Sequence, residues 1–282
     1  MILLLIVSFV WAFSFGLMKG RLGGLDSSFV AVVRLGLALL VFLPFLRLRG
    51  LKVTQTLWLL AIGAVQFGLM YLAYNASYKY LPAHEVALFT LTTPIFVTLT
   101  ADALEKTFRG RALLAALIAV AGAAVVIFKN TTPTADLTGV LLVQASNITF
   151  AIGLVFYRRI RLANPALVDR NIFALLYAGG LAVTLPLALY QTDFTALTLT
   201  PGQIWTLLYL GVIASGVCFF LWNIGSTRVS TGTLAVINNA KIPLAVVCSL
   251  VFFGEAADKL RLLIGGALMV AAVVLVGKGK VK

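Results

Sequence analysis

Acidic residues, histidine and cysteine are scarce in this sequence. Of its 282 residues only nine are aspartate or glutamate, one is histidine and two are cysteine. A membrane-embedded protease needs paired aspartates, a Ser/His pair or a zinc motif, and the sequence offers none of these patterns. It also lacks a Walker-type phosphate loop, which excludes ATP-driven transport within this chain. We therefore expect a protein that is not an enzyme and that uses no metal and no cofactor.

Hydrophobic residues are abundant instead: they make up 61% of the chain, and the mean hydropathy is +1.06. A soluble domain of this length has no core large enough to hide them, so we expect an integral membrane protein. Crossing a bilayer takes about 20 apolar residues as helix. The apolar runs are continuous rather than alternating, which favours helices over barrel strands. The sequence predicts ten transmembrane helices, at about 2–18, 27–46, 57–78, 84–102, 111–128, 137–157, 171–190, 204–225, 231–253 and 260–277.

The net charge of +13 is a topology signal, because the basic residues are sorted between the predicted loops. Loops on the side of the two termini carry most of them, for example Arg47, Arg109 and Arg158, whereas the opposite loops carry few. Basic loops stay in the cytoplasm. This pattern predicts a multi-pass protein of the bacterial inner membrane with both termini cytoplasmic, and it gives no reason to expect nucleic acid as a partner.

The chain contains a weak internal repeat. Residues 59–129 resemble residues 207–278 at an offset of about 148 to 150, and the match extends weakly upstream. We therefore predict two five-helix repeats, 1–130 and 131–282, in one membrane domain without a soluble part. An odd number of helices in each repeat makes the second copy enter the membrane the other way up. The aligned pairs are Gly63 with Gly211, Tyr74 with Trp222, Asn75 with Asn223, Pro94 with Pro243, and Glu105 with Glu255.

Several of these features together resemble a known family. They are the first run "SFVWAFSFGLMKG", Arg34 in the second run, the segments from Pro94 to Glu105 and from Pro243 to Glu255, and a small-residue helix after each segment. The chain is similar to the ten-helix, EamA-like members of the drug/metabolite transporter superfamily, and most to bacterial exporters of aromatic amino acids and related metabolites. The resemblance implies an all-α carrier that works by alternating access. It also implies a central cavity between spans 1 to 4 and 6 to 9, with spans 5 and 10 at the periphery.

Lys241 is the first candidate for substrate binding. It lies about ten residues into the ninth predicted span, so roughly 15 Å deep at 1.5 Å per residue. A cation at that depth indicates a functional site, and Asn238 shares its helix face at i, i+3 spacing. We interpret Lys241 as an anchor for a substrate carboxylate. The alternative is a structural lysine that closes the bundle through an ion pair or hydrogen bond.

Aromatic and polar side chains on other predicted spans would complete the cavity. Rings with a few polar groups suit a partly apolar solute, although large aromatics in membrane helices often serve only for packing or as interface anchors. The polar residues have a structural alternative as hydrogen-bonding contacts between helices. The further candidates are Trp11, Tyr74, Tyr78, Trp222, Ser8 and Asn147.

Pro94 and Pro243 lie near the middle of equivalent predicted spans. A proline removes one helical hydrogen bond and kinks the helix. We predict that the pair acts as hinges, with a static kink as the alternative.

His84 and Glu85 begin the fourth predicted span on the outer side. A histidine beside a carboxylate suits proton coupling, whereas a glutamate at a helix start also favours the helix dipole without any function. Arg34 is a potential ion-pair partner of Glu85.

The sequence thus predicts a secondary transporter, an exporter or facilitator, of aromatic or neutral amino acids and related metabolites. A carrier of phosphorylated or sugar metabolites is the main alternative, and a membrane enzyme or a lipid flippase is a more distant one. The expected partners are a small-molecule substrate and the lipid bilayer, with the protein as a monomer or a homodimer.

Overall fold

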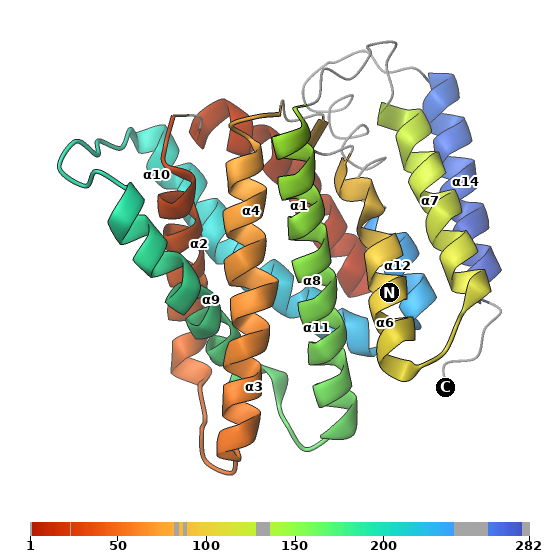
Figure 1. Cartoon of the computed structure of the whole chain (residues 1–282), viewed down its shortest axis with the longest axis horizontal. Coiled ribbons are helices and arrows are strands. Elements are labelled where there is room, and N and C mark those ends of the chain that lie inside the picture. The colour runs from red at the N-terminus through yellow and green to blue at the C-terminus, as the bar shows by residue number, and fades with distance from the viewer. Residues whose placement is uncertain are drawn as a thin grey trace.

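The computed structural model describes residues 2–22, 24–81, 85–86, 89–127, 136–239 and 259–277. Every regular element in these ranges is a helix, and the helices form one bundle (Figure 1). Pro82 to His84, Ala240 to Asp258 and the chain ends lie outside the described residues, so the predictions for His84, Lys241 and Pro243 do too.

The described residues of the first half of the chain form six α-helices and three short segments of other helical type. Arg34 lies in the second helix, and Tyr71 and Tyr74 lie near the end of the third long helical segment. The elements are α1 (Ile2–Leu22), α2 (Ser27–Phe42), the 3₁₀ turn η1 (Leu43–Phe45), α3 (Val53–Gly63), the π-helical η2 (Ala64–Leu69), α4 (Met70–Ser77), the 3₁₀ turn η3 (Thr90–Thr92), α6 (Thr93–Glu105) and α7 (Gly110–Ile127).

The second half follows a similar order. It consists of α8 (Leu137–Ala163), α9 (Asp169–Gln191), α10 (Pro201–Leu208), the π-helical η4 (Tyr209–Val217), α11 (Cys218–Thr227), α12 (Thr231–Asn238) and α14 (Lys259–Gly277).

Five helical segments are long and apolar enough to cross a membrane: Ser27–Phe45, Val53–Ser77, Leu137–Ala163, Asp169–Gln191 and Pro201–Thr227. These confirm five of the predicted spans to within a few residues. Helices α1, α6, α7, α12 and α14 overlap the other five, in some cases only in part. The all-helical, multi-pass fold is therefore confirmed, and the count of ten spans stays a prediction.

Two of the long segments contain a π-helical stretch at corresponding places. The first is η2 within Val53–Ser77, and the second is η4 within Pro201–Thr227. In Figure 1 the first segment rises from the lower edge of the bundle, whereas the second descends from the upper edge. π-Helical turns are rare and are found mostly at functional sites. Both stretches directly precede the residues that line the central cavity described below.

The two halves pack against each other reciprocally. Segment η2 lies against α9 of the second half, and η4 lies against α2 of the first half. A glycine stands at each crossing: a Cβ on Gly63 would collide with the backbone of Leu176, and a Cβ on Gly211 would lie 2.6 Å from Leu37 Cδ1. Only glycine permits these approaches.

An aromatic core joins α2, η2, α9 and α11 next to these crossings. The rings of Phe67 and Tyr177 stack 5.1 Å apart, Phe67 lies 4.9 Å from Phe219, and Phe42 lies 4.7 Å from Phe220. Such ring pairs add about 0.5–1.5 kcal/mol beyond the area that they bury. The core holds one wall of the central cavity rigid, because Phe219 belongs to both.

Helices α7 and α14 stand side by side at one edge of the bundle (Figure 1). Their contact is made by small residues: Ala115 and Ala119 are fully buried in a cluster with Val236 and Ala272. Small side chains let membrane helices approach closely. Both helices lie away from the cavity.

Candidate substrate cavity

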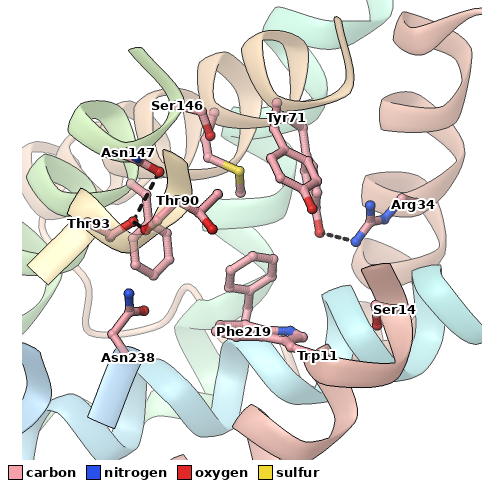
Figure 2. A pocket seen from close by; sticks show the side chains of 13 residues that line it. Trp11, Ser14, Arg34, Tyr71, Thr90, Thr93, Ser146, Asn147, Phe219 and Asn238 are labelled. Carbon is pink, nitrogen blue, oxygen red and sulfur yellow. Dashed lines mark hydrogen bonds between the residues drawn. The ribbon is translucent and has the colours of Figure 1, made fainter. Parts of the chain in front are cut away.

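A cavity opens in the middle of the bundle, between α1, α2, α4, α6, α8, α11 and α12 (Figure 2). The space open to the centres of water-sized spheres is about 100 Å³, several times the roughly 10–15 Å³ that one water needs. Arg34 and Tyr71 lie on one side of it in Figure 2, and Asn147, Thr93 and Asn238 lie on the opposite side. Its lining consists of Trp11, Ser14, Arg34, Met70, Tyr71, Tyr74, Thr90, Thr93, Ser146, Asn147, Phe150, Phe219 and Asn238.

Among the described residues that line the cavity, Arg34 is the charged one. It is 4% exposed; its Nε donates to Ser215 Oγ at 3.0 Å, its Nη2 donates to Tyr71 Oη at 2.7 Å, and its Cζ lies 4.2 Å from the centre of the Tyr71 ring. Tyr71 and Ser215 also share a hydrogen bond of 2.7 Å. All these partners are neutral. The ion pairs of the described residues belong to Arg109 and Arg161, so Arg34 has no carboxylate partner among them, and the predicted pairing with Glu85 is wrong there.

A buried cation without a counter-ion is costly, by several kcal/mol even after relaxation. The neutral hydrogen bonds and the aromatic ring offset part of this cost. They also fix the direction of the guanidinium. The arrangement attracts a small anion into the cavity and holds a donor group ready for it.

Polar groups on the opposite side are largely paired with each other. Asn147 Nδ2 donates to Phe89 O at 2.9 Å and to Thr92 Oγ1 at 3.0 Å, and its Oδ1 accepts from Thr93 Oγ1 at 3.0 Å. These bonds tie α8 to the start of α6. Pro94 stands in the first turn of α6, where the 3₁₀ turn η3 passes into α-helix. The first helical turn needs no N–H from a proline, and the predicted hinge role of Pro94 stays a prediction.

Asn238 is the exception on this side. It is the last residue of α12, it is 2% exposed, and neither its Nδ2 nor its Oδ1 has a hydrogen-bond partner among the described residues. In Figure 2 its side chain points from α12 toward Thr93 and Asn147. Leaving a buried polar group unpaired costs about 1–3 kcal/mol.

Aromatic rings form the surface between the two sides. The ring of Trp11 lies 5.0 Å from Phe219 and 5.0 Å from Trp222, and Phe150 lies 6.2 Å from Phe219. Trp11 Nε1 donates to Ala214 O at 2.9 Å, which anchors α1 to η4 and fixes the indole plane. An apolar part of a ligand fits against such rings.

The sequence profile of the EamA-like transporter family matches residues 1–128 and 137–278. The chain belongs to the EamA-like transporter family.

Curated relatives of this EamA-like transporter are close in sequence and similar in length. The biotin transporter of Escherichia coli strain K12 is 40% identical over 257 residues, which cover 90% of this chain and 85% of the relative. The probable biotin transporter of Pseudomonas aeruginosa is 40% identical over 271 residues, covering 95% and 94%. The biotin transporter of Salmonella typhimurium is 38% identical over 274 residues, covering 96% and 91%. The chain is thus a membrane transporter of a small molecule and not an enzyme.

One solved crystal structure has the same fold as this EamA-like transporter. Its TM-score is 0.78 at 18% sequence identity, and the match covers 97% of this chain and 95% of the other. At that identity the match concerns the fold alone. None of the three relatives is described as an exporter of aromatic amino acids, so the similarity that the sequence suggested is supported for the family and not for that substrate.

The structure brings four of the predicted site residues of this EamA-like transporter together at the cavity: Trp11, Tyr74, Asn147 and Asn238. The other described ones lie outside its lining. Ser8 Oγ donates to Leu4 O at 2.9 Å within the α1–α12 contact, and Tyr78 Oη pairs with Tyr74 Oη at 2.7 Å. Trp222 is fully buried behind Trp11. Of the predicted coupling pair, only Glu85 is described, and it is buried.

Sequence reasoning did not select Arg34 or Tyr71 as site residues, although both line the cavity. The signal for Arg34 was present, because a charge within a membrane span indicates function by the same rule that selected Lys241. No comparable signal marks Tyr71, whose role depends on lying 37 positions from Arg34 in the sequence and 2.7 Å from it in space.

Proposed function

We propose that this EamA-like transporter carries biotin across the bacterial inner membrane and that Arg34 binds the biotin carboxylate. The observation that carries the proposal is the guanidinium of Arg34, which lines the central cavity without an acidic partner among the described residues. The relatives described as biotin transporters support the choice of solute.

The chemistry of biotin matches the cavity at its charged side. Biotin is a monoanion at neutral pH, with the carboxylate at the end of a flexible apolar chain. A guanidinium has five N–H donors. In the structure one bonds Ser215, one bonds Tyr71 and one lies 3.5 Å from Met18 Sδ, a weak acceptor. Two donors and the weak one therefore remain to bind a carboxylate.

An amino acid substrate fits the same cavity less well. Its carboxylate would bind Arg34, but its ammonium group would also need a partner. None of the thirteen described residues that line the cavity is an aspartate or a glutamate. Burying an ammonium without an anion is unfavourable, so the cavity supports a carboxylate with a neutral polar end over a zwitterion.

The proposal also includes the inverted repeats and the alternating access that the sequence predicts. We infer two inverted repeats, 1–130 and 131–282, that exchange access to the cavity between the two membrane faces. The reciprocal packing of η2 on α9 and of η4 on α2 supports it, as does the match of one family profile to two consecutive segments. Cytoplasmic termini follow from the basic loops on that side.

The test is uptake of radiolabelled biotin into proteoliposomes that contain the purified protein, with and without a pH gradient. Arg34→Gln removes the charge, and Arg49→Gln in an exposed loop is the matched control. Hydrogen bonds to charged groups contribute about 1.5–3 kcal/mol, so we expect Arg34→Gln to raise KM for biotin by roughly 10- to 150-fold.

The competitors separate the alternatives. Biotinamide has no negative charge, so it should compete only weakly with biotin for the wild-type protein. Its inhibition constant should be the same for Arg34→Gln. Transport of phenylalanine without biotin would restore the amino acid prediction, and transport of phosphate esters alone would favour the alternative substrate class. Unchanged biotin uptake by Arg34→Gln would contradict the role of Arg34.

A further inference from the structure

The amide of Asn238 is held in a fixed place beside the cavity. The neighbouring Asn239 donates through Nδ2 to Leu91 O at 3.0 Å, which ties the end of α12 to η3. On the other flank Ser8 Oγ lies 3.5 Å from Ile237 O. Residues on both sides of Asn238 are thus connected to neighbouring elements, whereas the Asn238 side chain lines the cavity and bonds none of the described residues.

A primary amide presents two N–H donors and one carbonyl acceptor side by side. The ligand group that satisfies both kinds of atom at once carries an N–H next to a C=O in cis arrangement, as in a cyclic urea or a lactam. A carboxylate has no donor for Asn238 Oδ1, so one of its negatively charged oxygens would repel that amide oxygen. The free donor and acceptor of Asn238 therefore select a neutral, cyclic urea-like group.

We propose that Asn238 binds the ureido ring of the substrate through two antiparallel hydrogen bonds, from Nδ2 to the ureido oxygen and from a ureido N–H to Oδ1. This inference rests on the proposed function, because it assigns the second end of the biotin molecule. Figure 2 shows Asn238 and Arg34 at opposite sides of the cavity with Phe219 and Trp11 between them. The carboxylate lies at Arg34, the apolar chain and the sulfur-containing ring lie along the aromatic rings, and the urea lies at Asn238.

Two neighbouring polar side chains on that side, Asn147 and Thr93, are already hydrogen-bonded within the protein. Both N–H groups of Asn147 already bond Phe89 O and Thr92 Oγ1, and Thr93 Oγ1 already bonds Asn147 and Thr90 O. Asn147 and Thr93 are positioning residues that hold the start of α6. Asn238 is the specificity-determining residue that contacts the substrate.

The experiment compares biotin with lipoate in the proteoliposome assay. Lipoate has the same pentanoate tail and a five-membered sulfur ring, but it has no urea. Asn238→Leu replaces the amide with an apolar side chain of similar size. Thr206→Val is the matched control, since Thr206 is buried on α10 outside the cavity lining, with its hydroxyl bonded to Gly202 O at 2.7 Å. We expect Asn238→Leu to raise KM for biotin roughly 10- to 100-fold, as the loss of two hydrogen bonds implies. Inhibition by lipoate should stay at its wild-type strength.

A stability measurement distinguishes this role from a structural one. Asn238 makes no hydrogen bond to the described residues, so Asn238→Leu should unfold at the same temperature as the wild type or higher, and a given concentration of biotin should raise that temperature less than in the wild type. If Asn238 served only the fold, its replacement would lower the unfolding temperature and leave the response to biotin unchanged. The inference is wrong if Asn238→Leu weakens the binding of biotin and of lipoate equally, or if it leaves biotin transport unchanged. It is also wrong if the variant unfolds at a lower temperature than the wild type. If wild-type protein transports no biotin at all, the proposed function fails first.

Discussion

Gly63→Ala tests the helix crossing that positions one wall of the cavity. Gly63 ends α3, and a methyl group there would lie 2.5 Å from Leu176 Cα on α9 and closer still to the Leu176 carbonyl. Backbone atoms have no alternative rotamer, so α3 and α9 must separate. Because α3, η2 and α4 are one continuous helical segment, this shift would also move Tyr71 and Tyr74 at its far end.

Overpacking a well-packed site costs about 1–3 kcal/mol and occasionally more. We expect a destabilisation at the upper end of this range for Gly63→Ala, because the new methyl group would collide with main-chain atoms. Gly36→Ala on α2 is the matched control, since its methyl group would meet nothing within 4 Å. Gly36→Ala should raise the free energy of unfolding by about 0.5–1 kcal/mol, because alanine has a higher helix propensity than glycine.

The assay is thermal unfolding of the purified protein in detergent, followed by uptake of biotin. One kcal/mol corresponds to about 2–4 °C in a protein of this size, so Gly63→Ala should lower the unfolding temperature by roughly 5–10 °C and reduce uptake. Gly36→Ala should match or exceed the wild type in both. Equal stability of the two variants would refute the reasoning that the α3–α9 crossing requires a glycine.

Three further changes test other contacts. Tyr71→Phe removes the oxygen that accepts from Arg34 Nη2, and we expect KM for biotin to rise by about tenfold in the uptake assay. The buried Nη2 donor then lacks a partner, which costs about 1–3 kcal/mol, so the unfolding temperature should also fall. Ala119→Leu should destabilise by about 1–3 kcal/mol because Ala119 is fully buried between α7 and α14, whereas Ala121→Leu on the exposed face of α7 should be neutral in the same unfolding measurement. Asp26→Ala should cost about 1 kcal/mol, because the Asp26 carboxylate caps α2.

The cap at Asp26 also has a pH dependence. Burial raises the pKa of Asp26, but hydrogen bonds from the Ser28 side chain, the Phe29 backbone, the Thr192 side chain and the Ser28 backbone outweigh it, and the folded-state pKa lies below the usual value of 3.8. The stabilisation is therefore complete above that value and is lost as the pH falls through the lowered pKa. Asp26→Ala should differ from the wild type at pH 7 and converge with it in strong acid, as unfolding scans across pH would detect.

Most of the helices were predictable, and the cavity was predictable only in part. Apolar runs predicted Asp169–Gln191 and Pro201–Thr227 to within a few residues, because the backbone of a membrane span must satisfy its hydrogen bonds within its own helix. The π-helical stretches η2 and η4 had no sequence signal. They arise where a segment adjusts to the neighbouring helix at Gly63 and Gly211.

The site residues show the same division. Helical periodicity placed Asn238 on a polar helix face, but it could not show that the amide bonds none of the described residues. The sequence also treated Trp222 and Tyr74, which the predicted repeat aligns, as equal candidates, although only Tyr74 lines the cavity. Aromatic side chains at positions that the predicted repeat aligns face different neighbours, because the two aligned segments are not identical in sequence. Only the packing of α1 over α11 places Trp11 between Trp222 and the open space.

By itself the sequence determined what depends on composition and on short-range order: a membrane protein, the positions of its helices, the family resemblance and the absence of enzyme chemistry. Tertiary structure alone decided that the charge in the described cavity is Arg34 and that its partners are Tyr71 and Ser215, which lie 37 and 181 positions away. The reason is physical. Helical hydrogen bonds connect residues four apart, whereas a cavity is formed by side chains that meet only after seven helices have packed.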